Sequence, residues 1–277
     1  MHRRLLVLAC AILLTATGCA GSVGPFPADP DAASQSGAGS LPQFAPCTPA
    51  EATDTFLQPR VLTDADLSTD PDHFGILEPG RLEVRSVGPL ELVNGYLGAG
   101  NGFIAAGGGV PGVAVADHTV TATVTTSTLY AGDAERGLAF VEFHLSDEPP
   151  VSWTETDELG FGTDGGDGGF VATGGATAPS LSDDPGIDAQ VEASDRFIAA
   201  AFDEDGRSRS CVERTTAGRV DGFMVLTQGD GWFPTFVGRD AAGAVVSVVW
   251  YAITVPWAFA GLPGPAPEAF RDDPPVG

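Results

Sequence analysis

The chain contains no lysine. Its 13 basic residues are all arginines, against 37 aspartates and glutamates, and the formal net charge is −24 over 277 residues. A charge of this size and sign repels nucleic acid and anionic membrane surfaces, so we expect no nucleic-acid partner. The apolar run near the N-terminus, Leu5 to Leu14, has ten residues. Because a membrane-spanning helix needs about 20, we do not expect this run to cross a bilayer.

Sequence motifs that mark a reaction centre are missing as well. The chain has no Gly-x-Ser-x-Gly elbow, and its histidines form neither a His-x-x-x-His nor a His-Glu-x-x-His arrangement, so the sequence predicts no metal site. The glycine cluster Gly107-Gly108-Gly109 is not followed by Lys-Ser/Thr, which a phosphate-binding loop requires. These absences favour a protein that is not an enzyme and that uses no cofactor.

The first 18 residues have the pattern of a bacterial lipoprotein signal peptide. His2-Arg3-Arg4 is a positively charged start, Leu5 to Leu14 is the apolar region, and small residues lead to Cys19. These small residues before a cysteine resemble the lipobox, in which the cysteine is diacylated, with palmitate for example, and becomes the new N-terminus. We therefore expect Cys19 to anchor the protein to lipid on the extracytoplasmic face of the cell membrane. The alternative is ordinary secretion with cleavage nearby.

Two cysteines remain after Cys10 leaves with the signal peptide and Cys19 takes the lipid. They are Cys47 and Cys211. An even number of cysteines in an oxidising compartment predicts a disulfide bond. Two free, buried thiols are the alternative.

Composition divides the remaining chain into three parts. Residues 19–45 are rich in Gly, Ser, Ala, Pro and Asp without a hydrophobic period, which predicts a flexible tether. Residues 46–257 carry the strand patterns and are expected to form a single β-rich domain. Residues 258–277 are rich in proline and glycine, and we interpret them as a disordered tail.

Most of the regular structure is predicted to be β. Alternating or continuous apolar runs indicate strands at Leu82 to Val87, Leu90 to Leu97, Thr119 to Tyr130, Gly137 to Leu145, Val151 to Glu155, Cys211 to Thr216, Val220 to Leu226 and Ala244 to Val255. The last run is apolar almost throughout, which predicts a central strand. It is joined to the apolar run before it by Arg239-Asp240-Ala241-Ala242-Gly243, which reads as a hairpin turn. The fold class is therefore mainly β, a β-sandwich or a strongly bent antiparallel sheet.

One helix is expected beside these strands, over about residues 187–203. Val191, Ser194, Ile198, Ala201 and Phe202 keep a helical spacing in this stretch. Acidic residues early in the run suit the positive end of the helix dipole. We predict that this helix packs on the sheet.

Two short segments combine aspartate with glycine. One contains Asp164 and Asp167, within Gly162 to Phe170, and the other is Gly229-Asp230-Gly231-Trp232-Phe233-Pro234. Glycines allow backbone angles that a β-carbon disfavours, so each aspartate is held on a tight bend. We predict Asp164, Asp167, Asp230 and Trp232 as candidate binding residues, with both loops facing one pocket. The alternative is that the glycines serve turns and the aspartates cap backbone amides locally.

Two ligand classes suit these residues. Asp164 and Asp167 offer oxygen ligands on a pliable loop, as calcium prefers, although the spaced acids and terminal glutamate of an EF-hand are missing. The tryptophans at 153, 232, 250 and 257 suggest a stacking platform for sugar, although Trp250 lies in an apolar run and is expected in the core.

The same two segments resemble the bacterial domain-of-unknown-function 4241 family. Gly229-Asp230-Gly231-Trp232-Phe233-Pro234, followed by Phe236, Gly238, Asp240 and Gly243, looks like that family's C-terminal signature. Asp164, Gly166, Gly168 and Phe170 are similar to its Val-Asp-Ala-Gly-Thr-Gly-Cys-Phe loop, with Thr163 in place of the valine and Gly169 in place of the cysteine. The resemblance runs from about Leu82 to Tyr251. It implies a related fold and a shared pair of loops, but no reaction.

These observations favour a membrane-anchored extracytoplasmic lipoprotein that acts as a non-enzymatic binding or interaction module. Its expected partners are membrane lipid, through acylated Cys19, and an envelope protein or polysaccharide. The alternative is a carboxylate-dependent hydrolase acting on an envelope polymer, with Glu155, Glu158, Asp164 and Asp230 as candidate acids. An enzyme would gather two or more carboxylates with perturbed pKa values in one concave site, whereas a binding module would expose an aromatic or apolar surface.

Overall fold

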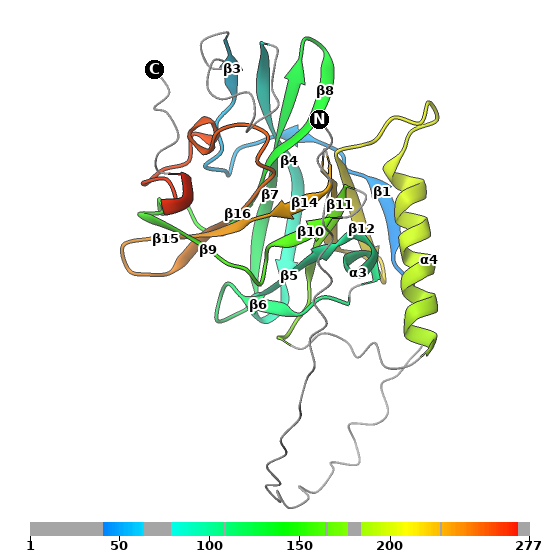
Figure 1. The fold of residues 1–277 in the computed structure, drawn as a ribbon. Coiled ribbons are helices and arrows are strands. Elements are labelled where there is room, and N and C mark those ends of the chain that lie inside the picture. Colours follow the sequence, from blue (N-terminus) through cyan, green and yellow to red (C-terminus); the bar gives the residue numbers. More distant parts are fainter. Residues whose placement is uncertain are drawn as a thin grey trace, which may run out of the picture. The chain divides into compact units, whose positions relative to one another are not determined.

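The structure, a computed structural model, describes residues 41–63, 79–107, 109–163, 166–176, 184–227 and 229–270. All of them belong to one compact unit of the chain, which begins at Ser40. Cys19, the signal peptide and most of the predicted tether lie outside the described residues. The chain within these ranges is mainly β, with antiparallel strand pairs, as the sequence predicts (Figure 1).

The smaller of the two main sheets has six strands within the described ranges. Their order is β1 (Gln43–Pro46), β12 (Cys211–Thr216), β13 (Arg219–Leu226), β11 (Asp167–Ala172), β5 (Tyr96–Asn101) and β6 (Gly112–Ala114). Strand β1 lies within the segment predicted as a tether, so the folded domain begins a few residues earlier than residue 46. Its pairing with β12 places Cys47 beside Cys211, and the predicted disulfide bond is formed, with a Cα–Cα distance of 5.5 Å.

The larger sheet has eight strands in the described part of the chain. The order is β2 (Ala50–Glu51), β4 (Gly80–Leu92), β7 (Val120–Ala131), β8 (Ala134–His144), β16 (Val245–Tyr251), β15 (Thr235–Arg239) and β9 (Ser152–Glu155), and β3 (Arg60–Leu62) also pairs with β4. Strand β16 lies between β8 and β15, which confirms the central position predicted from its apolar sequence. The predicted hairpin turn joins β15 to β16, and the Asp240 carboxylate caps it by accepting from the amides of Ala242 and Ala244.

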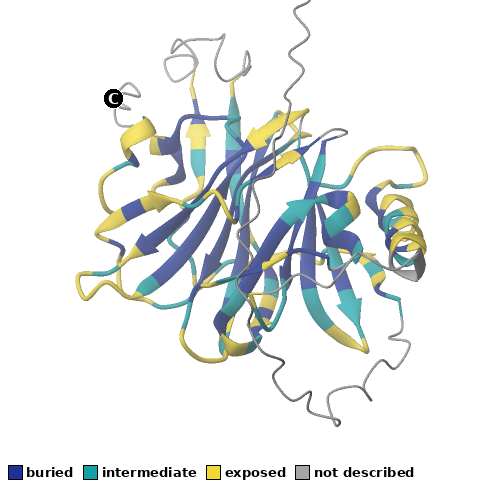
Figure 2. Ribbon diagram, turned by 60° about the horizontal axis from the view of Figure 1, so that its bottom comes forward, coloured by how far each residue is buried: buried dark blue, intermediate teal, exposed yellow. Residues whose placement is uncertain are grey.

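The main core lies between the two sheets. It contains Phe170 and Phe223 from the smaller sheet and Phe143 and Trp250 from the larger one, all 0 or 1 % exposed. Figure 2 shows the buried strands of the interior in dark blue, with the turns exposed. This sandwich-like packing of two sheets is one of the two predicted architectures.

One local prediction is wrong in this region. The strands predicted at Leu82 to Val87 and Leu90 to Leu97 are not split at Gly88-Pro89. Instead, β4 runs through this point, with a register shift between Ser86 and Gly88 that accommodates the proline as a bulge. The glycine-rich stretch from 98 to 112 contains the end of β5 and a short helix, α3 (Gly102–Gly107), for which the sequence showed no helical period.

The predicted helix exists as α4 (Asp184–Ala201), and of the residues whose spacing predicted it only Ala201 is fully buried. Ala193, Phe197 and Ala201 are fully buried, and Phe197 contacts the ring of Phe44 at 5.9 Å. Val191 and Ile198, which revealed the helix in the sequence, are 44 and 43 % exposed. The helix was therefore predicted correctly, although most of the residues that revealed it are not the ones that pack.

Two chain segments cover the outer face of the larger sheet. One is residues 52–62, and the other follows β16 and includes the 3₁₀ turns η2 (Trp257–Ala260) and η3 (Glu268–Phe270). A third 3₁₀ turn, η1 (Val93–Gly95), joins β4 to β5. The prediction of a disordered tail from residue 258 is wrong for residues 258–270, because Phe259 packs in a buried aromatic cluster. Residues 271–277 lie outside the described residues.

Candidate functional site

A two-stranded ribbon brings the two acidic glycine loops together. It consists of β10 (Phe161–Thr163) and β14 (Gly231–Phe233), which pair antiparallel with Phe161 opposite Phe233 and Gly162 opposite Trp232. Because side chains alternate between the faces of a strand, the two phenylalanines share one face and Trp232 points the other way. The inward face is fixed in the core: the Phe161 ring stacks on Trp250 at 5.7 Å with an interplanar angle of 7°.

Hydrogen bonds hold the two loops side by side beyond the ribbon. The hydroxyl groups of Thr163 and Thr227 both donate to the carbonyl oxygen of Gly229, at 3.0 and 2.8 Å. The amide of Thr227 donates to the carbonyl of Gly166 at 2.6 Å. The loops predicted from sequence are therefore neighbours. Asp164, one of the four predicted site residues, lies outside the described residues.

Trp232 presents a half-exposed indole ring on the outer face of the ribbon. It is 51 % exposed, whereas Trp153, Trp250 and Trp257 are at most 7 % exposed. Trp250 lies in the core as expected, and the suggested stacking platform is wrong because Trp153 and Trp257 are buried as well. The indole lies against the backbone of Gly160 and Gly162. A β-carbon at Gly160 would stand 2.6 Å from its Cζ2 atom, and one at Gly162 would stand 3.8 Å from Cε3.

Exposed carboxylates lie close to this ring in the chain. Asp230 is exposed and stands two residues before Trp232, at the bend that leads into β14. The turn that leads into Gly160 carries exposed Asp157 and Glu158. Glu158 accepts a hydrogen bond from the Thr156 hydroxyl at 2.7 Å, and this bond lowers its pKa. Glu158 therefore stays ionised at neutral pH.

Asp167 points elsewhere. Its carboxylate lies against Gly102 at the start of α3, where a β-carbon on Gly102 would collide with it. The side chain is partly buried at the first position of β11. Burial raises its pKa, and a backbone hydrogen bond offsets part of the increase. Of the predicted site residues, Asp230 and Trp232 are thus both exposed and close in the chain, and Asp167 is turned toward α3.

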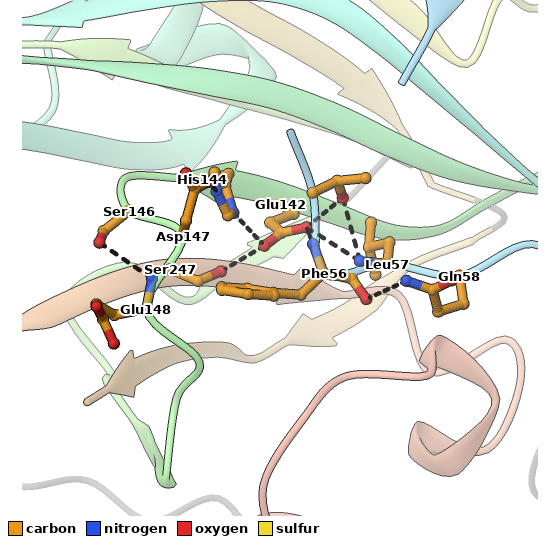
Figure 3. Close-up of polar contacts among 10 residues, drawn as sticks. Phe56, Leu57, Gln58, Glu142, His144, Ser146, Asp147, Glu148 and Ser247 are labelled. Carbon is orange, nitrogen blue, oxygen red and sulfur yellow. Dashed lines mark hydrogen bonds and ion pairs between the residues drawn. The ribbon is translucent and has the colours of Figure 1, made fainter. Parts of the chain in front are cut away.

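A buried polar cluster on the outer face of the larger sheet was missed by sequence reasoning (Figure 3). At its centre is Glu142 of β8, which is 0 % exposed. One carboxylate oxygen accepts from the Thr55 hydroxyl at 2.5 Å and from the amides of Phe56 and Leu57 at 2.9 and 3.3 Å. The other accepts from the Ser247 hydroxyl at 2.9 Å. The carboxylate therefore ties the segment around residues 55–57 to β8 and β16.

His144 completes this cluster. Its Nδ1 atom is 3.4 Å from the Glu142 carboxylate, and its Nε2 atom is 3.2 Å from that of Asp147. Burial alone lowers the pKa of His144, but the hydrogen bonds and charges of Glu142 and Asp147 outweigh it, so the pKa is raised. His144, the last residue of β8, is 6 % exposed between β7 and β16, whereas His118 lies in an exposed turn.

A signal for this cluster was present in the sequence. Glu142 and His144 interrupt the apolar run of β8 at alternate positions, while Val141 and Phe143 face the core between the sheets. Such alternation is typical of a strand with one face in water. Only the covering segments, which come from the two ends of the domain, reveal that this face is buried.

None of the helices in the described ranges combines the length and apolarity that a bilayer crossing requires. No group of three or more His, Cys, Asp or Glu side chains lies close enough to hold a metal ion in that part of the chain. Comparison with family models, with curated proteins and with solved structures returns no match.

Proposed function

We propose that the protein is an extracytoplasmic lipoprotein, anchored to the membrane through diacylated Cys19, that binds an envelope component on the Trp232 surface without catalysing a reaction. The Trp232 surface is the outer face of the β10–β14 ribbon with Asp230 and the turn at Asp157 and Glu158. The observation that carries the proposal is the half-exposed indole, which lies over glycine while its underlying strands are fixed in the core.

The chemistry of this surface suits a saccharide of the envelope. An indole that is open on one side offers an apolar plane on which the C–H face of a sugar ring can stack. Exposed carboxylates near it in the chain, at Asp157 and Glu158, are of the type that accepts hydrogen bonds from sugar hydroxyls. The net charge of −24 disfavours anionic ligands, so a neutral or basic glycan is the expected class.

The properties of Glu158 and Glu142 argue against hydrolysis. Glycoside hydrolysis needs one carboxyl group with a raised pKa and a second at a defined separation. The pKa of Glu158 is lowered, which is the opposite of what a proton donor requires. Glu142 has hydrogen-bond donors on both oxygens and is fully buried, so it has no access to a polymer.

The experiment uses the ring itself as a reporter. Because the other three tryptophans are buried, acrylamide quenching of tryptophan fluorescence reports chiefly on Trp232. We expect soluble fragments of envelope polysaccharide to protect the fluorescence, and Trp232→Ala to abolish both the quenching and the binding measured by calorimetry. Binding that is unchanged in Trp232→Ala would contradict the proposed surface.

Two glycine variants provide a matched control. Gly160→Ala places a methyl group 2.6 Å from the indole and must displace the ring, whereas Gly162→Ala places one at an ordinary contact distance of 3.8 Å. We expect Gly160→Ala to weaken binding at least tenfold and Gly162→Ala to leave it within twofold. Equal effects of the two variants would show that ring placement does not determine binding.

The membrane anchor is tested separately. Mass spectrometry of the native protein should find an acylated Cys19 as the first residue, and Cys19→Ser should move the protein from the membrane to the soluble fraction. An intact Met1, or a soluble wild-type protein, would contradict the anchor without touching the Trp232 surface.

A carboxylate-dependent hydrolase is the second candidate, favoured by the raised pKa of Asp167. If it is correct, the protein should release reducing ends from envelope polysaccharide, and Asp167→Asn should remove that activity while the fold is kept. If wild type and variant both bind the polysaccharide and neither releases reducing ends, the hydrolase is contradicted and the binding module is supported.

A further inference from the structure

Helix α4 carries a stripe of large apolar side chains that face away from the domain. Ile187, Val191 and Ile198 are 48, 44 and 43 % exposed, and Phe202, directly after the helix, is 41 % exposed. Their spacing of four, seven and four residues places them along one side of the helix over four turns. We call these four residues the α4 stripe. Figure 2 shows α4 at the edge of the domain with exposed outer turns.

Packing of α4 on its own domain does not use this stripe. The helix is held by Ala193, Phe197 and Ala201, which are fully buried and lie on a different side. A surface helix with an apolar face already buried normally carries polar residues on the remaining faces. The second apolar face therefore has no role within the described residues, and a contiguous exposed apolar surface of this kind is typical of a protein interface.

The residues beside the stripe are mainly acidic. Asp188 and Asp195 are exposed and stand seven residues apart along the same flank of the stripe. Glu192 also lies on this flank and forms an ion pair with Arg196 at 2.7 Å. No ion pair joins Asp188 or Asp195 to a basic group within the described ranges. The flank thus presents two uncompensated carboxylates.

This charge pattern disfavours two occupants. If a second copy packed on the stripe antiparallel about its midpoint, Asp195 would face Asp195 of the other copy, and the two like charges would repel. An anionic membrane surface would be repelled by the same carboxylates. The occupant that suits the stripe therefore has a surface of its own that is apolar at the centre and basic at the border.

We propose that the α4 stripe is the docking site for an amphipathic helix of another protein, with apolar side chains facing Val191 and Ile198 and lysines or arginines facing Asp188 and Asp195. Helices recognise one another through such apolar anchors three, four or seven residues apart. Opposite charges at the border fix the register and exclude wrong partners. This site is separate from the Trp232 surface and needs no saccharide ligand.

The test uses a synthetic probe of the proposed chemistry. An 18-residue fluorescent peptide with leucines on one helical face and lysines beside them is titrated against the full chain carrying Cys19→Ser, which removes the lipid. We expect saturable binding that weakens at least tenfold in Val191→Ser/Ile198→Ser and at least threefold in Asp188→Asn/Asp195→Asn. A peptide with glutamates in place of the lysines should bind at least tenfold more weakly.

Control variants separate the stripe from general attraction to an acidic protein. Val61 and Val151 are exposed apolar residues on other elements, at 73 and 51 %, and Val61→Ser/Val151→Ser should leave the affinity within twofold. Trp232→Ala should leave it unchanged as well, so failure of the two proposals can be distinguished. Binding that ignores the α4 variants overturns the docking site.

Two further outcomes would replace the proposed occupant. Sedimentation that shows a concentration-dependent dimer, lost in Val191→Ser/Ile198→Ser, would assign the stripe to a second copy of the chain. Binding of the Cys19→Ser protein to phosphatidylglycerol vesicles, lost in the same variant, would assign it to lipid. Either result overturns the proposal.

Discussion

Two regions of this protein place a carboxylate, an aromatic ring and hydroxyl groups beside a β-strand, and they differ in what covers them. The Glu142 cluster lies beneath residues 55–57, and its carboxylate is 0 % exposed with donors on both oxygens. The Trp232 surface has no such cover in the described chain, and its indole is half exposed. The comparison teaches that residue type does not separate a structural polar cluster from a recognition surface; the position of neighbouring segments does.

The largest loss of stability is expected from a substitution in the buried Glu142 cluster. Glu142→Ala leaves the hydroxyls of Thr55 and Ser247 and two backbone amides without their acceptor in a dry site. We expect a loss of about 4 kcal/mol in the free energy of unfolding, because uncompensated buried polar groups are costly. Urea unfolding measures it. Glu135→Ala, an exposed glutamate on the same strand, is the control and should change stability by less than about 0.5 kcal/mol. Equal effects would show that Glu142 is not structural.

The next largest loss of stability is expected on the inner face of the β10–β14 ribbon, which anchors it to the core, and not on the outer face, which is proposed for recognition. Phe161→Ala removes a fully packed ring beside Trp250 and should cost about 3 kcal/mol of stability. Trp232→Ala, on the opposite face of the same ribbon, should cost less than about 1 kcal/mol, since half of its surface is already in water. Thermal unfolding of both variants checks the contrast. A larger loss for Trp232→Ala would make it a core residue and remove the basis of the binding proposal.

A smaller loss of stability is expected when the covering segment at residues 55–57 loses its hydroxyl contact with Glu142. Thr55→Val keeps the shape of the side chain but removes the hydroxyl that donates to Glu142. We expect a loss of about 1 kcal/mol, the usual net contribution of one hydrogen bond. The backbone near residues 55–57 should also exchange its amide hydrogens faster. Unchanged exchange there would mean that the segment is held by Leu57 and its neighbours rather than by the carboxylate.

The smallest effect is a pH dependence that only the buried region should show. The pKa of His144 is raised in the folded state by Glu142 and Asp147, so the folded protein binds the proton more tightly than the unfolded chain. The stabilisation is fully present below about pH 6.5, the unfolded value, and is lost as pH rises through the higher folded value. His144→Gln should flatten the unfolding free energy across this window. His118→Gln, at an exposed histidine, should not.

Much of the fold could be predicted from sequence because the strands carry local patterns. The alternation in Thr119 to Tyr130 and the apolar run in Ala244 to Val255 predicted β7 and β16, and the adjacency of the two acidic glycine loops was also expected. Sequence failed where a residue's environment depends on distant segments. Phe259 directly precedes a proline- and glycine-rich stretch like that of a tail, yet it packs against strands more than 100 residues earlier in the chain.

The sequence by itself determined the type of most elements, the pairing of Cys47 with Cys211, and the presence of aspartates on glycine-rich bends beside Trp232. These follow from local backbone preferences, hydrophobic period and cysteine count, which neighbouring residues or simple arithmetic fix. Only the tertiary structure decided which faces are covered: that Glu142 and His144 are buried, that Trp232 is open, and that α4 turns Val191 and Ile198 outward. Burial depends on which segments meet across the sheets, and a period along one strand or helix identifies two faces without saying which of them water reaches.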